Sequence, residues 1–219
     1  MDDRDVDDVA IQLTPPQPLS GMIRVAEENS KEPSGLQVEI DPIRPGRSSY
    51  IFARADGSFD FPPIAAEQYR VSVGGIGHYL KEIRYGDVMS NDGTVTVTGA
   101  GGSLLLVLST RVAHLTGRMS ATAVGAPRIV LIPAGAADVR QATLDQTGMF
   151  SFGDVRPGAY KLYAFEGAPD GVWEDPDFMK EFSAAGVEIH LDEGEVKSTD
   201  VPLIPKSDLM PVLKKLGLE

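Results

Sequence analysis

The sequence lacks cysteine, and it has few of the residues from which most catalytic sites are built. Its 219 residues include no cysteine, one tryptophan and three histidines. The absence of thiols excludes a disulfide framework, thiolate metal ligands and thiol catalysis. It leaves the cellular compartment open, because a secreted protein with a large enough core needs no disulfides.

The chain also lacks an excess of positive charge and a long apolar run. Its formal net charge is -12, whereas a surface that binds duplex nucleic acid needs a basic stripe to displace counterions from the phosphates. The apolar run Leu104–Leu108 has the length of a strand and falls far short of the roughly 20 residues of a membrane-spanning helix. We therefore expect neither a nucleic-acid partner nor insertion into a membrane.

Turn-forming residues and short apolar stretches are abundant instead. The chain contains 23 glycines and 16 prolines, and 42% of its residues are hydrophobic. This composition is typical of a soluble protein built from many strands and turns around a core. The length fits one large domain or two domains of about 100 residues each.

An internal repeat divides the chain into two similar halves. The segment DGSFDFPPIAAEQYRVSV (residues 56–73) aligns with TGMFSFGDVRPGAYKLYA (residues 147–164). Phe59 aligns with Phe150 and Tyr69 with Tyr160, in both cases 91 positions later. The same shift places VEIDP (residues 38–42) over IVLIP (residues 129–133) without a gap. A fixed offset over so long a stretch indicates a duplicated module.

Within each module the apolar residues recur with a period of two. Phe150 and Phe152 fall on one face of a predicted strand, and Tyr160 and Leu162 fall on one face of the next. Pro157–Gly158 supplies the connecting turn. About seven such strands in each module predict an all-β protein of two tandem antiparallel β-sandwich domains, with at most short helical turns. We place the first domain at 16–110 and the second at 111–206. An acidic N-terminal segment without regular structure (1–15) precedes them and a C-terminal tail (207–219) follows.

One short helix is predicted after the repeat motif of the second module. In EDPDFMKEFSAAG, Asp175 is an N-cap residue and Pro176 occupies the first helical position. Phe178 and Phe182 then lie on one helical face, and Gly186 can end the turn. The tail SDLMPVLKKLGLE has the pattern of another short amphipathic segment, which Pro211 limits.

The motif G-x-F-x-F, a loop containing P-G-x-Y and then KLYAF resembles the carboxypeptidase regulatory-like domains. These are prealbumin-like, or Ig-like, sandwiches related to the B repeats of bacterial surface adhesins. The continuation WEDPDFMKEFSAAGVEIHLDEGEVKSTDVPLIP resembles a terminal module of large secreted acidobacterial proteins. The resemblance covers residues 115–205 fully and residues 19–109 more loosely. The first module departs from the pattern, since Glu67–Gln68 replaces the Pro-Gly turn.

The duplication, the acidic surface and the lack of a catalytic set favour a non-catalytic role, and the resemblance implies a secreted or cell-surface protein. There the two modules would space, stabilise or present other domains of the same parent protein, which are the expected partners. The N-terminal MDDRDVDD does not resemble a secretory signal, and the final Leu-Glu resembles a vector-derived pair. Either the protein is cytosolic or its leader lies outside this chain. The final pair favours the second alternative, so we expect an extracellular, periplasmic or cell-surface location, with the signal sequence outside this chain.

No set of residues predicts catalysis. His78, His114 and His190 fall on different predicted strands or strand edges without the paired spacing of metal ligands. The set of His and Arg residues of transthyretin-related hydrolases, which share this general shape, is missing. The only asparagines, Asn29 and Asn91, stand in polar loops, so we expect no Lys–Asn isopeptide bond, and the intact mass should show no loss of ammonia. We expect no enzyme activity and no cofactor.

The segment from Glu166 to Glu195 is the best candidate for a functional surface, because it carries many carboxylates and the only tryptophan. Clustered carboxylates can hold Ca²⁺, but acidic runs are more often solvated faces and no calcium-loop spacing is present. An exposed tryptophan beside acids could instead bind a carbohydrate or another polymer by stacking and hydrogen bonding. The alternative is that Trp173 covers the end of the core. The candidate binding residues are Asp170, Trp173, Glu174, Asp175 and Asp177.

Overall fold

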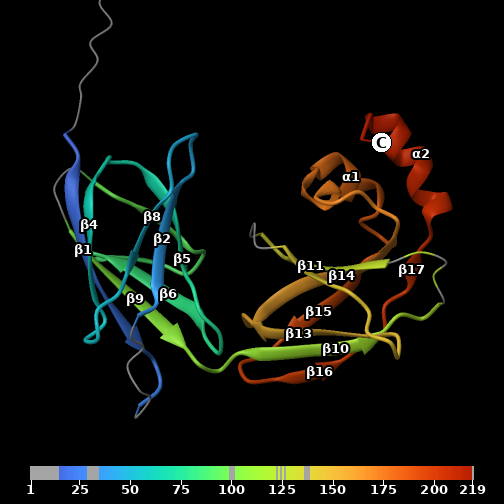
Figure 1. Ribbon diagram of the computed structural model, residues 1–219, viewed down its shortest axis with the longest axis horizontal. Helices are drawn as coiled ribbons and strands as arrows, with labels where there is room; N and C mark the ends of the chain where they lie inside the picture. Colours follow the sequence, from blue (N-terminus) through green and yellow to red (C-terminus); the bar gives the residue numbers. More distant parts are fainter. Residues whose placement is uncertain are drawn as a thin grey trace, which may run out of the picture. The chain divides into compact units, whose positions relative to one another are not determined.

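The computed structural model describes residues 15–28, 35–98, 102–121, 123, 125, 127–135 and 139–218 (Figure 1). The predicted acidic N-terminal segment lies outside these residues except for Pro15. The chain divides into two compact units, of which the first ends at Ser109 and the second begins at Thr110, with the short segment Ile76–Tyr79 assigned to the second. We call them module 1 and module 2.

Module 1 is a sandwich of two sheets. Its first sheet has the strand order β4 (Ser58–Ile64), β1 (Gln17–Val25), β9 (Ser103–Ser109), β6 (Tyr79–Tyr85) and β7 (Val88–Ser90). Its second sheet has the order β3 (Ser49–Phe52), β2 (Gln37–Pro42), β5 (Gln68–Val73) and β8 (Thr94–Thr96). Alternate residues of both sheets, among them Phe59, Leu106 and Ile40, form one buried cluster between them.

Module 2 repeats this arrangement and adds helices. One sheet has the order β13 (Met149–Val155), β10 (Ala113–Arg118) and β16 (Val196–Ser198). The other has the order β12 (Arg140–Ala142), β11 (Pro127–Pro133), β14 (Gly158–Glu166) and β15 (Val187–Leu191), and β17 (Leu203–Ile204) also pairs with β14. The helices are the 3-10 turn η1 (Val172–Glu174), α1 (Pro176–Glu181) and α2 (Lys206–Leu216).

The predicted all-β class with two sandwich modules is confirmed, and one detail of the pairing differs from the prediction. Most strand pairs are antiparallel, but β1 pairs in parallel with β9, and β10 pairs in parallel with β16. In each module the first strand therefore lies beside a strand from the end of the same module. This closes the sheet with a long-range contact that the period-two pattern does not specify.

The two modules share their strand register as well as their sequence pattern. Gly21 lies opposite Phe59 in module 1, and Gly117 lies opposite Phe150 in module 2. At both glycines a side chain would collide with the phenylalanine ring, since a Cβ would lie 2.1 Å from Phe59 and 2.6 Å from Phe150. The ring of the repeated Gly-x-Phe-x-Phe motif thus packs directly over the glycine of the neighbouring strand.

A buried tyrosine closes the same loop in both modules. The Tyr69 hydroxyl donates to the carbonyl of Ala65 at 3.1 Å, and the Tyr160 hydroxyl donates to the carbonyl of Arg156 at 2.6 Å. Both tyrosines bond four residues back along the chain, over loops whose sequences differ. Pro157 and Gly158 form the predicted turn in module 2, where Gly158 has a φ of 150°.

Module 2 has a third layer that the two-layer prediction does not include. In β14, Leu162 and Ala164 face the sandwich core, whereas Tyr163 and Phe165 face the opposite side of the sheet. There they pack with residues of the helices in a second buried cluster. Figure 1 shows α1 and α2 on one side of the sheet of β11 and β14, and β10, β13 and β16 on the other.

The helix predicted at Pro176 is confirmed, but it ends earlier than expected. The Asp175 side chain accepts hydrogen bonds from the N–H groups of Asp177 and Phe178 at 2.8 and 3.0 Å. The ring centroids of Phe178 and Phe182 lie 5.0 Å apart. The helix ends at Glu181, and Gly186 has a different role. A Cβ at Gly186 would lie 2.5 Å from the Tyr163 ring, so the glycine permits close packing.

The C-terminal segment forms a longer helix than Pro211 suggests. α2 runs through this proline and ends at Gly217, whose φ of 68° lies in the left-handed region. Leu209 and Leu213, four residues apart, are fully buried in the helical cluster. The helix occupies most of the predicted C-terminal tail and is part of the packed structure of module 2.

Candidate functional site

The five candidate residues do not form one binding surface. Trp173 lies in η1, Asp175 caps α1, Asp177 stands in its first turn, and Asp170 and Glu174 are exposed on the segment before it. All five residues therefore belong to the connection between β14 and β15, but the tryptophan ring is buried and the carboxylates lie at or near the surface.

The buried position of Trp173 does not fit the stacking role considered for it. Only 3% of the residue is exposed, and it belongs to the buried cluster between the helices and the outer face of β11 and β14. Its ring has no free face for a sugar, so the carbohydrate-binding hypothesis loses its aromatic platform. The alternative, that the tryptophan covers hydrophobic structure, is the one observed, although it covers the outer face of a sheet rather than the end of the sandwich. Its indole Nε1 is buried without a hydrogen-bond partner.

The neighbouring carboxylates have local structural contacts. The Asp175 carboxylate is occupied by the two backbone N–H groups that it caps. Asp177 adds negative charge to the first turn of α1, where its interaction with the helix dipole is stabilising. The exposed Asp170 carboxylate lies 3.2 Å from the Arg128 guanidinium on β11. These contacts hold the helical segment in place.

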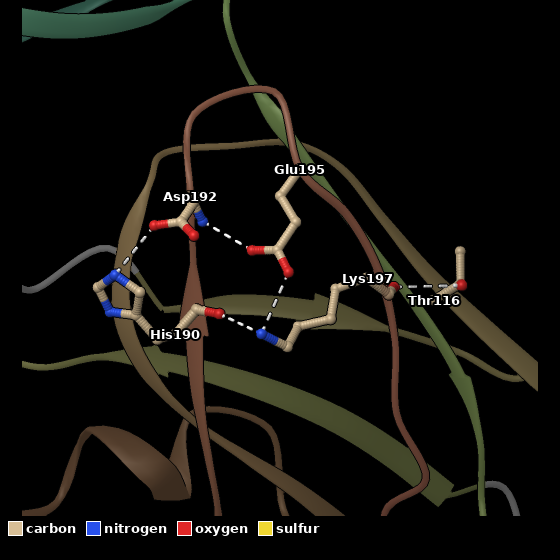
Figure 2. Close-up of polar contacts among 5 residues, drawn as sticks. All are labelled: Thr116, His190, Asp192, Glu195 and Lys197. Carbon is tan, nitrogen blue, oxygen red and sulfur yellow. Dashed lines mark hydrogen bonds and ion pairs between the residues drawn. The ribbon is translucent and has the colours of Figure 1, made fainter.

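A second polar cluster lies where the chain passes from one sheet of module 2 to the other, between β15 and β16 (Figure 2). The Lys197 ammonium donates to the carbonyl of His190 at 2.6 Å and lies 3.2 Å from the Glu195 carboxylate. The other oxygen of Glu195 accepts from the backbone N–H of Asp192 at 2.8 Å. The His190 ring nitrogen Nε2 lies 3.4 Å from the Asp192 carboxylate. Sequence reasoning did not identify this group as a cluster.

The side chains of this cluster could take part in acid–base chemistry, but their contacts close the turn. The N–H of Asp192 and then the Lys197 ammonium hold the pKa of Glu195 below its ordinary value, which keeps the carboxylate charged. The Thr116 hydroxyl of β10 donates to the carbonyl of Lys197 at 3.4 Å, which connects β16 to its neighbour (Figure 2). The cluster thus fixes the crossing between the sheets.

Three other carboxylates with a lowered pKa are turn residues. Hydrogen bonds from Ser58 lower the pKa of Asp56, and those from Ser90 and Thr94 lower that of Asp92. The backbone N–H of Met149 lowers the pKa of Asp145. In each case the first cause is a hydrogen bond from a residue two to four positions away in the sequence, as in turns closed by aspartate.

The histidines do not converge on a metal-like arrangement. His114 lies on β10 and His190 on β15, and the ring nitrogen Nδ1 of His78 lies 3.2 Å from the carbonyl of Ile76. Among the described residues, no three His, Asp or Glu side chains are grouped so that they could hold a metal ion. Within the same residues, no helix combines the length and the apolar character needed to cross a membrane.

A shallow hollow opens beside β12 and β13, and its charged groups already have partners. Arg128 and Asp145 are among its lining residues, together with Gln141 and Phe150. Arg128 pairs with Asp170, and one carboxylate oxygen of Asp145 accepts hydrogen bonds from Thr147 and Met149 at 2.7–3.0 Å. The hollow therefore offers few free groups to a ligand.

The surface that sequence reasoning missed lies on module 1. Tyr50 and Phe52 on β3 are 62% and 58% exposed, and Arg44 and Arg47 are exposed just before the strand. The available signal was the alternation in SYIF, which places both aromatic residues on the face opposite to the core residue Ile51.

Comparison with known proteins gives limited information. No family model matches the chain, and no curated protein matches it. Among solved structures, the minor pilin GBS52 of Streptococcus agalactiae is similar at a TM-score of 0.40 and 9% identity, over 86% of this chain and 97% of that one. A streptococcal ancillary pilin gives 0.37 and 12% over 86% and 63%, and the Bacillus anthracis TIE protein gives 0.32 and 14% over 86% and only 34%. With all three TM-scores below 0.5, these similarities support no conclusion about function.

Proposed function

We propose that the chain is a non-catalytic pair of structural modules of a secreted or cell-surface protein, acting without a cofactor, which spaces or presents other domains of the same parent protein. The observation that carries this proposal is that the same framework contacts recur in both modules. The N–H of Arg54 donates to the carbonyl of Ser58 at 2.8 Å, and the N–H of Asp145 donates to the carbonyl of Met149 at 2.8 Å. The buried tyrosines and the Gly–Phe contacts recur in the same way.

The environments of four carboxylates also support a non-catalytic role. Asp56, Asp92, Asp145 and Glu195 are held as carboxylates by turn hydrogen bonds. A general acid or base at neutral pH needs the opposite environment, one that brings the pKa closer to 7. These residues therefore stabilise turns at the ends of strands.

A spacing role requires a fixed distance between the modules, and this can be measured directly. The segment that joins them, residues 110–114, contains neither glycine nor proline, so we expect a stiff junction. Because the chain has no cysteine, Val88→Cys and Val196→Cys introduce the only two thiols, at positions that are 69% and 74% exposed. Spin labels at these thiols should give one narrow distance distribution by pulsed electron paramagnetic resonance.

A matched control inserts a Gly-Ser linker after Thr110, which should broaden the distribution. A distribution as broad in the parent chain as in the linker variant would contradict the spacing role. A catalytic turnover that disappears on His190→Ala or Glu195→Gln would contradict the non-catalytic assignment.

A further inference from the structure

The outer edge of module 1 combines a free strand with exposed aromatic and cationic side chains. β3 stands at the end of its sheet, in the order β3-β2-β5-β8, and among the described strands it pairs with β2 alone. We call Arg44, Arg47, Tyr50 and Phe52 the β3 patch. A strand that ends a sheet presents backbone groups to which another strand can bind.

The backbone groups of the two aromatic residues are the ones that face the open edge. Ala53 donates its N–H to the carbonyl of Leu36, the residue before β2. The direction of N–H groups alternates along a strand, so Ile51 also faces β2, while Tyr50 and Phe52 face away from it. Their N–H and C=O groups are therefore available to an added strand.

The side chains of Tyr50 and Phe52 are not needed by the core. Their ring centroids lie 6.2 Å apart in an edge-to-face arrangement at the surface, whereas Ile51 between them packs against the core. At the same two positions, 91 residues later, module 2 carries Gln141 and Thr143. The duplicated framework thus folds without aromatic residues here, and exposing two of them has a hydrophobic cost that a bound partner would remove.

The segment that contains the strand carries a charge opposite to that of the whole chain. Residues 42–55 contain three arginines and no acidic residue, in a protein of net charge -12. Arg54 pairs with Asp60 at 2.7 Å. Arg44 and Arg47 have no ion pair within the described part of the chain, so their charge is available to a ligand.

The charge also discriminates between partners. Cations beside an edge strand protect it from pairing with a second copy, because two copies would bring their arginines together. The same cations attract an acidic segment. We propose that the β3 patch binds an extended acidic peptide segment of a partner protein by strand addition, with backbone bonds to Tyr50 and Phe52, contact with both rings and ion pairs to Arg44 and Arg47. In this mode of recognition, main-chain hydrogen bonds provide affinity and side-chain contacts provide specificity. The proposal does not depend on the proposed spacing function.

The test uses the whole chain and a fluorescent probe peptide of alternating aspartate and valine, blocked at both ends. Binding is followed by fluorescence anisotropy at low and at high salt. A peptide with lysine in place of aspartate tests the charge. A peptide with proline in place of the central valine tests strand pairing, because proline removes a backbone donor.

The protein variants separate the contributions of the patch. Tyr50→Ala/Phe52→Ala should weaken binding at least about tenfold, and Arg44→Gln/Arg47→Gln should weaken it and remove most of its salt dependence. Tyr50→Pro should bind more weakly than Tyr50→Ala, since both lack the ring but only the former lacks the edge N–H. Gln141→Ala at the equivalent edge of module 2 should bind like the parent protein, and thermal unfolding should confirm that all variants are folded.

The proposal is overturned if the parent protein does not bind the aspartate–valine probe, or if the lysine or proline peptide binds equally well. Equal binding by Tyr50→Ala/Phe52→Ala would also overturn it. If the parent chain dimerises in sedimentation and this double variant does not, the occupant is a second copy and the proposed peptide partner is wrong.

Discussion

Replacing Leu209 by alanine tests whether the helical layer and the sandwich of module 2 form one cooperative unit. Leu209 is fully buried in the cluster that contains Trp173 and Phe165. Truncating a buried leucine costs about 2–5 kcal/mol, which includes the transfer of its methyl groups and the cavity left behind. Alanine favours the helix, so the loss reports packing and not helix propensity. For a domain of this size, a lowering of the midpoint by roughly 10–20 °C is expected.

The single tryptophan makes this measurement specific. Trp173 lies in the same cluster, and the chain has no other tryptophan, so its fluorescence follows module 2 alone. In the parent protein the fluorescence transition should coincide with the loss of β-sheet circular dichroism from module 2. Met210→Ala is the matched control on the same helix, at a residue that is 39% exposed, and it should cost less than about 1 kcal/mol.

Two results would refute the reasoning. A Leu209→Ala variant with an unchanged fluorescence midpoint would show that α2 contributes little to the stability of the cluster. A fluorescence transition that falls well below an unchanged sheet transition would show that the helices unfold alone, and that the sandwich of module 2 is stable without them.

Three further predictions concern local contacts. Asp175→Ala should lower the stability of module 2 by about 1 kcal/mol by removing the cap of α1, and Asp175→Asn should retain most of it, both measured by urea unfolding. Because the folded pKa of Asp145 is lowered, its stabilising effect is present above its unfolded pKa of about 4 and is lost as the pH falls through the lower folded value. Asp145→Asn should therefore be less sensitive than the parent protein to acidification below about pH 5, and an equal loss in acid would contradict this. Millimolar Ca²⁺ or EDTA should leave the unfolding midpoint unchanged, whereas a clear upward shift with Ca²⁺ would reveal a calcium site.

The framework of both modules was predictable because it is determined by local patterns. Phe59 and Phe150, which the shift of 91 aligns, have equivalent strand partners in Gly21 and Gly117, although these glycines are 96 positions apart. Period-two alternation fixes which side chains enter the core, and Gly and Pro mark the turns. The parallel pairing of β1 with β9 depends on residues far apart in the sequence, which no local pattern specifies.

The helical layer was harder to predict because one signal opposed it and another, in β14, favoured it. Pro211 argues against a helix, yet α2 tolerates it, since the burial of Leu209 and Leu213 compensates for the missing backbone bond. β14 did contain a signal, because Tyr163 and Phe165 are apolar on the face that a two-layer sandwich leaves to solvent. The tryptophan and the acids of the candidate site are neighbours in the sequence, but the tryptophan is buried whereas most of the acids are exposed. The sequence pattern alone does not reveal this difference in burial.

Besides the C-terminal β17 and α2 of module 2, the two modules differ at an equivalent place in their shared framework. In module 1, residues 74–93 lie between β5 and β8 and include the hairpin of β6 and β7. In module 2, the equally long segment 167–186 lies between β14 and β15 and forms η1 and α1. The first insertion extends the sheet of β1 and β9 and leaves Tyr50 and Phe52 at the other sheet's edge uncovered. The second covers the outer face of β11 and β14. Because the sandwich is stabilised by contacts common to both modules, such an insertion can change without disturbing the fold. The open edge of module 1 is therefore the place where binding can differ from module 2, and the β3 patch is the feature to test first.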